Sequence, residues 1–153
     1  MGFFSSLTGQ GNAQQPSIND EHAYIKWFIL NSPDAIVLRD LFEIRGSPSR
    51  SEMEKLAGQF ASLCIKFQRE ADTADKLFER VLDLAQDWKD FQPIIEARGG
   101  FITMPTWPFN IVEATWQLVG QIVVFKHLLI EKYHHKRAEE LFAVLKGQVR
   151  IKQ

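Results

Sequence analysis

The residues best suited to chemistry are Glu131 and His134, which have the Glu-x-x-His spacing that di-iron sites use in helical bundles. Such a site needs about six ligands, so the pattern must occur twice and be joined by further glutamates that face inward. No second copy is present, because neither His22 nor His127 follows a glutamate by three positions. We therefore interpret the pattern as part of a solvated helix surface and expect no metal site.

Cys64 is the only cysteine, which excludes an internal disulfide and any zinc site built from several cysteines. It lies between Phe60 and Phe67 on an apolar helical stripe, where no neighbouring base would lower the pKa of its thiol. Gly99 and Gly100 lack the lysine and the glycine spacing of a phosphate-binding loop. We therefore predict a non-enzymatic protein that uses no cofactor and no small-molecule substrate.

The N-terminal leader, residues 1–17, combines a modification pattern with an apolar tip. Gly2 and Ser6 fit the short Met-Gly-x-x-x-Ser pattern of N-myristoylation, which has meaning only where the transferase is present. The apolar residues of the tip are Phe3, Phe4 and Leu7. The polar stretch that follows contains glycine and proline and shows no periodicity, as is typical of a flexible segment. Such a tip can insert into a membrane interface, dock on a partner, or fold back on its own domain.

The densest basic cluster is His134, His135, Lys136 and Arg137. Residues 121–153 hold seven Lys and Arg against three Glu, a net charge of +4, whereas the whole chain carries −1. One interpretation is contact with anionic lipid, RNA or an acidic partner. The other, which we favour, is a helix end whose bases complement the negative pole of the helix dipole. The cluster lacks aromatic residues for base stacking, so we do not expect nucleic acid as a partner.

The elements that position these residues are predicted from hydrophobic periodicity. Ser49 and Glu52 fit a capping box, and apolar residues then recur at alternating steps of four and three as far as Trp88. This seam of the coiled-coil type predicts one helix over residues 49–90, roughly 60 Å long. A second long helix, over residues 110–145, is apolar around more of its circumference. It should therefore be the central helix or pack against another chain.

Residues 91–108 form the one substantial irregular connection in this prediction, because prolines and glycines obstruct helix continuation. The obstructing residues are Pro93, Gly99, Gly100, Pro105 and Pro108. Large apolar side chains are nevertheless frequent in and beside this connection, among them Phe101, Met104, Trp107 and Phe109. A solvated linker would not carry them, so the connection is either a packed cap on the bundle or a loop that binds a partner.

Two helices of similar length that are joined by one connection should pack antiparallel. The predicted fold is therefore an all-α bundle built on a long helical hairpin, residues 49–90 and 110–145, with two shorter N-terminal helices at 18–30 and 33–45 packed across it. In this prediction residues 18–153 form a single domain.

Composition and charge narrow the function. With 45% apolar and 24% charged residues the chain is an ordinary globular protein, and its net charge of −1 favours neither nucleic acid nor an acidic substrate. Polar residues interrupt the most apolar segment, Ile111 to Ile130, at helical spacing, so we expect a buried helix face and not a membrane span. The first seven residues lack the regions of a secretory signal, so we expect a cytoplasmic location.

The leading functional hypothesis is a non-enzymatic adaptor or structural subunit that binds a protein partner or forms a homo-oligomer. Twelve phenylalanines and four tryptophans are many for so small a bundle, and aromatic residues are typical interface anchors. An alternative is a peripheral protein at the cytoplasmic membrane face, held by the N-terminus and the basic C-terminal helix. A third is a metal-binding or catalytic bundle, whose support is the Glu-x-x-His pattern alone.

Overall fold

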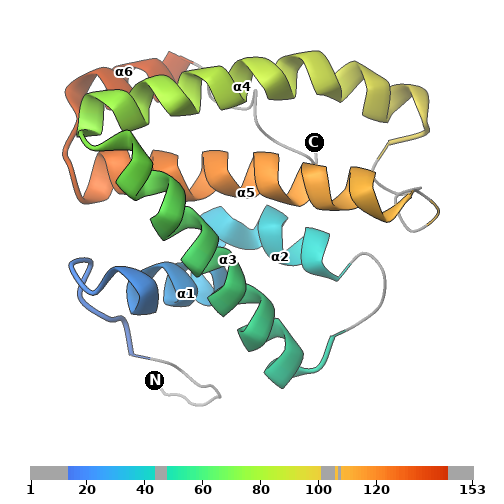
Figure 1. Ribbon diagram of the computed structural model, residues 1–153, viewed down its shortest axis with the longest axis horizontal. Coiled ribbons are helices and arrows are strands. Elements are labelled where there is room, and N and C mark those ends of the chain that lie inside the picture. The colour runs from blue at the N-terminus through green and yellow to red at the C-terminus, as the bar shows by residue number, and fades with distance from the viewer. Residues whose placement is uncertain (1–13, 44–47, 101–105, 107, 145–153) are drawn as a thin grey trace.

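The computed structural model describes residues 14–43, 48–100, 106 and 108–144, and every regular element in these ranges is a helix. In chain order the elements are α1 (Glu21–Asn31), the 3-10 turn η1 (Pro33–Ala35), α2 (Ile36–Phe42), α3 (Arg50–Ala71), α4 (Ala74–Ala97), α5 (Phe109–Glu131) and α6 (Lys136–Val144). The fold is therefore an all-α helical bundle, as the sequence predicts (Figure 1).

The central helix of the bundle is α5. It lies beside α4 across the width of the molecule and also packs against η1, α2, α3 and α6 (Figure 1). The chain reverses direction between α4 and α5, so these two helices form an antiparallel hairpin. In contrast, α3 crosses the bundle obliquely and packs mainly against α1. The wide apolar circumference of α5 is explained by this position, because neighbours cover it on several sides.

The predicted helix over residues 49–90 is wrong as a single element, because the chain turns sharply between α3 and α4. Asp72 has φ 73° and ψ −50°, and the N–H of Thr73 donates to the carbonyl of Ala71 at 2.8 Å. These values define a γ-turn with a non-glycine residue at positive φ, which is rare and strained. The hydroxyl of Thr73 accepts from the N–H of Lys76 at 3.2 Å and caps α4. The turn divides the apolar seam, so that α3 faces α1 while α4 faces α5.

The start of α3 agrees with the prediction. The hydroxyl of Ser49 accepts from the N–H of Glu52 at 3.1 Å, and the carboxylate of Glu52 accepts from the N–H of Ser49 at 2.8 Å. These hydrogen bonds confirm the capping box and lower the pKa of the Glu52 carboxyl. The two shorter helices also lie near their predicted ranges, with the second beginning as the 3-10 turn η1.

The sequence predicts that the long helix ends before Pro93. In the structure Pro93 lies inside α4. Its ring removes one backbone hydrogen bond near the end of the helix. The complete burial of Ile95 in one cluster with Val112 and Val119 of α5 offsets that loss. As a result α4 continues to Ala97 and the irregular connection is shorter than predicted.

The predicted helix over residues 110–145 is also broken, into α5 and α6. His134 has φ 50°, and the N–H of His135 donates to the carbonyl of Leu129 at 2.9 Å. This turn sends α6 back toward the start of α4, where Ala138 is fully buried (Figure 1). The burial of Ala138 stabilises the folded state and explains the break, since a straight continuation of α5 would carry Ala138 away from the core.

Two clusters of buried side chains form the core. The larger one joins α1, α2 and α3 to the start of α4 and the C-terminal half of α5, and its largest members include Phe28, Phe78 and Phe125. The smaller cluster lies under the joined ends of α4 and α5 and consists of Leu41, Trp88, Ile95, Val112, Val119 and Ile122. At Gly120 the missing Cβ leaves space on α5 that the side chains of Phe60 and Leu38 occupy.

Tyr24 and His127 link α1 to α5 across the core. The hydroxyl of Tyr24 and Nε2 of His127 are joined by a hydrogen bond of 2.7 Å, and the imidazole also lies against the ring of Phe28 with centroids 4.2 Å apart. Burial lowers the pKa of His127 below its ordinary value of 6.5, more than the nearby Glu131 and Asp34 raise it.

The free energy of unfolding should therefore decrease as the pH falls below about 6.5. In that range the unfolded chain binds a proton at His127 more readily than the folded chain, so protonation favours unfolding; above it the contribution is fully present. The measurement is urea denaturation of the wild type and of His127→Gln between pH 7.5 and pH 5.5, a range that spans the ordinary histidine pKa of about 6.5. An equally steep loss of stability in His127→Gln would contradict this assignment.

Candidate interaction surface

Most of the residues predicted to contact a partner lie outside the described residues. These are Gly2, Phe3, Phe4 and Leu7 of the leader and Phe101, Met104 and Trp107 of the connection. Phe109 is the first residue of α5, and its side chain is likewise outside the description. The structure therefore locates only the basic cluster, which forms the turn between α5 and α6 and the first turn of α6.

Two members of the basic cluster, His135 and Arg137, hold the start of α6 against the start of α4. His135 accepts the N–H of Ala138 at Nδ1 (3.2 Å), so its Nε2 carries the proton and donates to Oδ1 of Asp75 at 2.7 Å. The imidazole of His135 stacks on Phe78 with ring centroids 4.8 Å apart, and the guanidinium of Arg137 lies 4.8 Å from the centre of the same ring. These contacts give His135 and Arg137 a structural role in the fold.

The other two members of the basic cluster, His134 and Lys136, are exposed. Lys136 begins α6, so its charge lies at the positive end of that helix and does not complement its dipole. The predicted complement to the negative pole of a helix therefore does not hold for Lys136 and Arg137, which lie in the first turn of α6. His134 and His135 directly follow the C-terminal end of α5, because the chain turns at His134.

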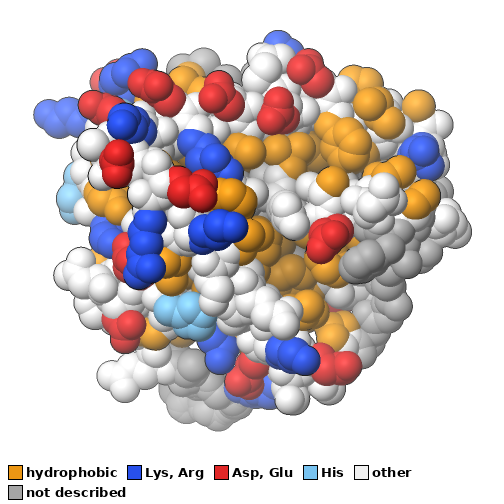
Figure 2. Space-filling view, in the orientation of Figure 1, with side chains coloured by type: hydrophobic (Ala, Val, Ile, Leu, Met, Phe, Trp, Pro, Cys, Tyr) orange, Lys and Arg blue, Asp and Glu red, His pale blue; other side chains and the backbone are white. Residues whose placement is uncertain are grey.

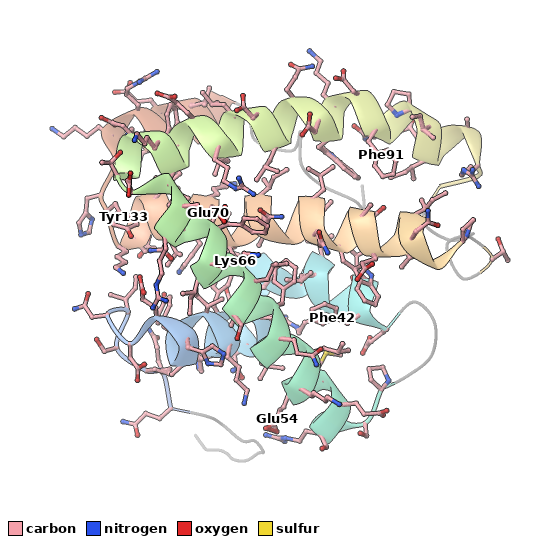
Figure 3. The ribbon with its side chains drawn as sticks, in the orientation of Figure 1. Phe42, Glu54, Lys66, Glu70, Phe91 and Tyr133 are labelled. Carbon is pink, nitrogen blue, oxygen red and sulfur yellow. The ribbon has the colours of Figure 1, made fainter. Side chains whose placement is uncertain are left out.

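A surface at the joined ends of α4 and α5 includes Phe91 and Ile94, which the sequence predicts to lie in the irregular connection, residues 91–108, and which lie in α4. We call it the apolar end and define it by Phe91, Ile94, Ile111 and Leu118. Ile94 is 53% exposed, and the other three are half-buried against the smaller core cluster. Figure 2 shows apolar atoms gathered over the C-terminal half of α4, where Figure 3 labels Phe91.

The local sequence explains why this surface has a firm base. Phe91 and Ile94 are three residues apart and therefore neighbours on one face of α4. Trp88 and Ile95, both 1% exposed, lie three residues before and four residues after Phe91 and form the adjoining, buried side of the same turns. The apolar end is thus carried by a packed helix, and a ligand that covers it would meet side chains that are already oriented.

The last turn of α4, where the predicted connection leaves the helix, lies beside the apolar end. The N–H of Gly100 donates to the carbonyl of Ile95 at 3.0 Å, and Gly99 and Gly100 have φ values of 101° and 81°. This glycine termination turns the chain back over the last turn of α4. Pro108 lies immediately before α5 as its N-cap. Gly100 and Pro108, the described residues on either side of the segment 101–107, therefore both adjoin the apolar end.

The structure places the residues that the sequence singled out for chemistry, Cys64, Glu131 and His134. Cys64 is completely buried, and burial raises the pKa of its thiol far above the ordinary range, so it packs as a small apolar residue, as the sequence predicts. Within the described ranges no group of three His, Cys, Asp or Glu side chains is placed to hold a metal ion. The one pattern with a metal-binding spacing, Glu131 and His134, straddles the end of α5, and helical spacing no longer relates the two side chains there.

A cleft of about 690 Å³ lies between α1 and the first turns of α3, in the size range of small-ligand pockets. Its apolar lining includes Trp27, Leu30 and Met53, and its charged lining is mixed in sign. The guanidinium of Arg39 in this lining donates to the carbonyls of Ile29 and Ser32 at 2.8 Å each, so it ties α2 to the end of α1. The cleft therefore offers apolar contact rather than a set of reactive groups.

No known protein family, characterised protein or solved structure matches this chain. No helix in the described part is long and apolar enough to cross a membrane. What the geometry defines is a class of fold, an all-α helical bundle, which carries an exposed apolar end on its central hairpin.

Proposed function

We propose that this chain is a non-enzymatic interaction module, an adaptor or subunit, that binds another protein through the apolar end. The observation that carries the proposal is the 53% exposure of Ile94 beside Phe91 on a rigid helix face. Complete burial of an isoleucine is worth roughly 1.5–3 kcal/mol, so a partner that covers Ile94 would gain about half of that from this side chain. A large aliphatic group held in this way is a natural anchor for an interface.

The four residues of the apolar end are too few for a stable interface, which buries about 800 Å² on each partner. The described residues that flank the segment 101–107, Gly100 and Pro108, adjoin α4 and α5 beside them, and the sequence of this segment holds the large apolar residues Phe101, Met104 and Trp107. We therefore include this segment in the proposed surface. Together they provide the cluster of aromatic and aliphatic residues that hot spots contain.

The charges around the apolar end indicate the chemistry of the partner. The exposed charged residues one helical turn from Phe91 or Ile94 are Asp87 and Asp90, against Arg98. This rim is net negative. We infer a partner that presents apolar side chains flanked by lysine or arginine, since complementary rims speed association and exclude wrong partners.

The membrane alternative needs two attachments, the leader and the basic cluster. Of the basic cluster, His135 already binds Asp75, and Arg137 lies on Phe78. The acidic rim of the apolar end would also be repelled by anionic lipid. These contacts favour a protein partner over a lipid surface, and we make lipid binding an outcome of the test.

The test is affinity capture from the native source with a C-terminal tag, using the wild type, Ile94→Glu and Ile36→Glu. Ile36 is the matched control, because it is 57% exposed but lies at the start of α2, outside the apolar end. Circular dichroism should show that all three proteins are folded. We expect a protein that the wild type and Ile36→Glu capture equally and that Ile94→Glu captures at least about tenfold less, equivalent to about 1.4 kcal/mol.

Two results would overturn the proposal. One is a partner that Ile94→Glu captures as well as the wild type does. The other is flotation of the wild type with anionic vesicles, lost on deletion of residues 1–10, with no captured protein that depends on Ile94. In that case the membrane alternative would replace it.

A further inference from the structure

The apolar register of α3 continues into α4 across the turn between them. Phe67, Ala71, Ala74 and Phe78 continue the steps of four and three across the turn without a change of register. No glycine or proline occurs between Gly58 and Pro93. Glycine and proline are the strongest helix breakers, so the signal to turn here is confined to Asp72 and the N-cap residue Thr73.

The turn itself is strained. Its central residue, Asp72, adopts a positive φ without being a glycine, and the turn is held by the short hydrogen bond from Thr73 to Ala71. If Asp72 and Thr73 became helical, the strain would be lost and α3 and α4 would join. The joined helix from Arg50 to Ala97 would be about 70 Å long, at 1.5 Å per residue.

The chain can be divided at this turn into two halves that hold each other by non-covalent contacts. The N-terminal half comprises residues 14–71 and the C-terminal half residues 74–144. Polar side chains join the halves, and among these links are Tyr24 to His127 at 2.7 Å, Glu21 to Lys132 at 2.7 Å, and Gln68 to the hydroxyl of Tyr133. Figure 3 shows Tyr133 and Glu70 at the end of the molecule where this turn lies.

Apolar contacts between the halves are equally specific. Phe60 and Leu38 occupy the space at Gly120, Phe42 packs edge-on against Trp116 at 5.7 Å between ring centroids, and Phe28 lies against His127. The indole N–H of Trp116 also donates to the carbonyl of Leu41 at 2.9 Å. None of these contacts requires that the two halves belong to the same chain.

We propose that the α3–α4 turn is a hinge, and that it opens into one continuous helix so that two copies of this chain exchange halves. In the exchanged dimer the N-terminal half of each copy packs on the C-terminal half of the other, and every contact between the halves is retained. Short connections under strain favour such exchange. The partner at this site is a second copy of the chain. The inference does not rest on the proposed function, because Ile94 is not part of the hinge.

Two kinds of substitution at the hinge should shift the equilibrium between the closed monomer and the exchanged dimer in opposite directions. Asp72→Gly removes the cost of positive φ and weakens a continuous helix, so it favours the closed monomer. The pair Asp72→Ala and Thr73→Ala keeps that cost, removes the cap of α4 and favours the helix, so it promotes the dimer. We expect the dimer dissociation constant to differ by at least about tenfold between the two variants, as measured by sedimentation equilibrium over the micromolar range.

An isotope-filtered NOE experiment identifies exchange in the dimer. Labelled and unlabelled copies are unfolded, mixed and refolded, so that NOEs between different copies can be selected. Phe28 and His127, with ring centroids 4.2 Å apart, belong to different halves and should show an NOE between copies. Phe78 and His135, 4.8 Å apart, belong to the same half and should show none.

The inference is overturned if Asp72→Ala with Thr73→Ala, shown to be folded by circular dichroism, dimerises no more than Asp72→Gly. It is also overturned by a dimer without the Phe28–His127 NOE between copies, since that dimer is not exchanged. Ile94→Glu provides the separation from the proposed function. It should leave the exchanged dimer unchanged whether or not it abolishes capture of another protein.

Discussion

Replacing Gly120 with alanine should lower the free energy of unfolding by about 1–3 kcal/mol, the usual cost of overfilling a packed core. An ideal Cβ at this position would lie 2.7 Å from Cε2 of Phe60 and 3.1 Å from Cδ1 of Leu38. The ring of Phe60 cannot simply move away, because it also packs edge-on against Phe42 with centroids 6.3 Å apart. Urea denaturation followed by circular dichroism measures the change.

The control for this prediction is the same substitution in a Phe60→Leu background. Leucine lacks the far end of the ring that the new methyl group would meet, so there alanine should be neutral or stabilise by up to about 1 kcal/mol through its helix propensity. The double-mutant cycle isolates this coupling. Equal costs in both backgrounds would show that α3 does not approach α5 at Gly120.

Replacing Trp88 with alanine should cost about 3–5 kcal/mol, the range for deleting a buried aromatic side chain. Trp88 is 1% exposed and is the largest fully buried side chain in the described ranges, in one cluster with Ile95, Val112 and Val119. Its loss leaves a cavity under the apolar end that the two helices of a hairpin can fill only by moving closer together. Urea denaturation again supplies the measurement, and Trp88→Phe, which keeps an aromatic ring, should cost clearly less.

A substitution outside the core sets the baseline for this result. Ile36→Ala removes an exposed aliphatic side chain and should change the free energy of unfolding by less than about 0.5 kcal/mol. If Trp88→Ala were similarly mild, Trp88 would not be packed between α4 and α5. The base of the proposed surface would then be absent.

The class of the fold is predictable from the sequence because hydrophobic period and caps are local properties. The Ser49–Glu52 capping box, the buried Cys64 and the central position of the last long apolar helix all follow from such patterns. The break at Asp72 does not, because the heptad seam is equally compatible with a straight helix and with a helix folded back at the turn. Only the packing of α3 on α1 and of α4 on α5 decides between these arrangements.

The candidate surface was only partly predictable for a related reason. Pro93 suggests a loop after Phe91, so the sequence offers no way to see that Ile94 lies on a helix and faces outward. Conversely, the basic cluster looks like a free charged patch, whereas His135 and Arg137 contact Asp75 and Phe78 of another helix. Burial and exposure depend on the neighbours that folding brings together, and short-range spacing does not contain that information.

The central claim, that the apolar end binds another protein, is tested most directly by the affinity of the purified partner. Titration calorimetry with the wild type, Ile94→Glu and Ile36→Glu gives three dissociation constants for the partner. The two substituted side chains have similar exposure in the wild type. The account predicts a loss of affinity of at least about tenfold for Ile94→Glu and a change of less than about twofold for Ile36→Glu. Equal affinities for all three proteins would contradict it, because the partner would then bind elsewhere on the bundle.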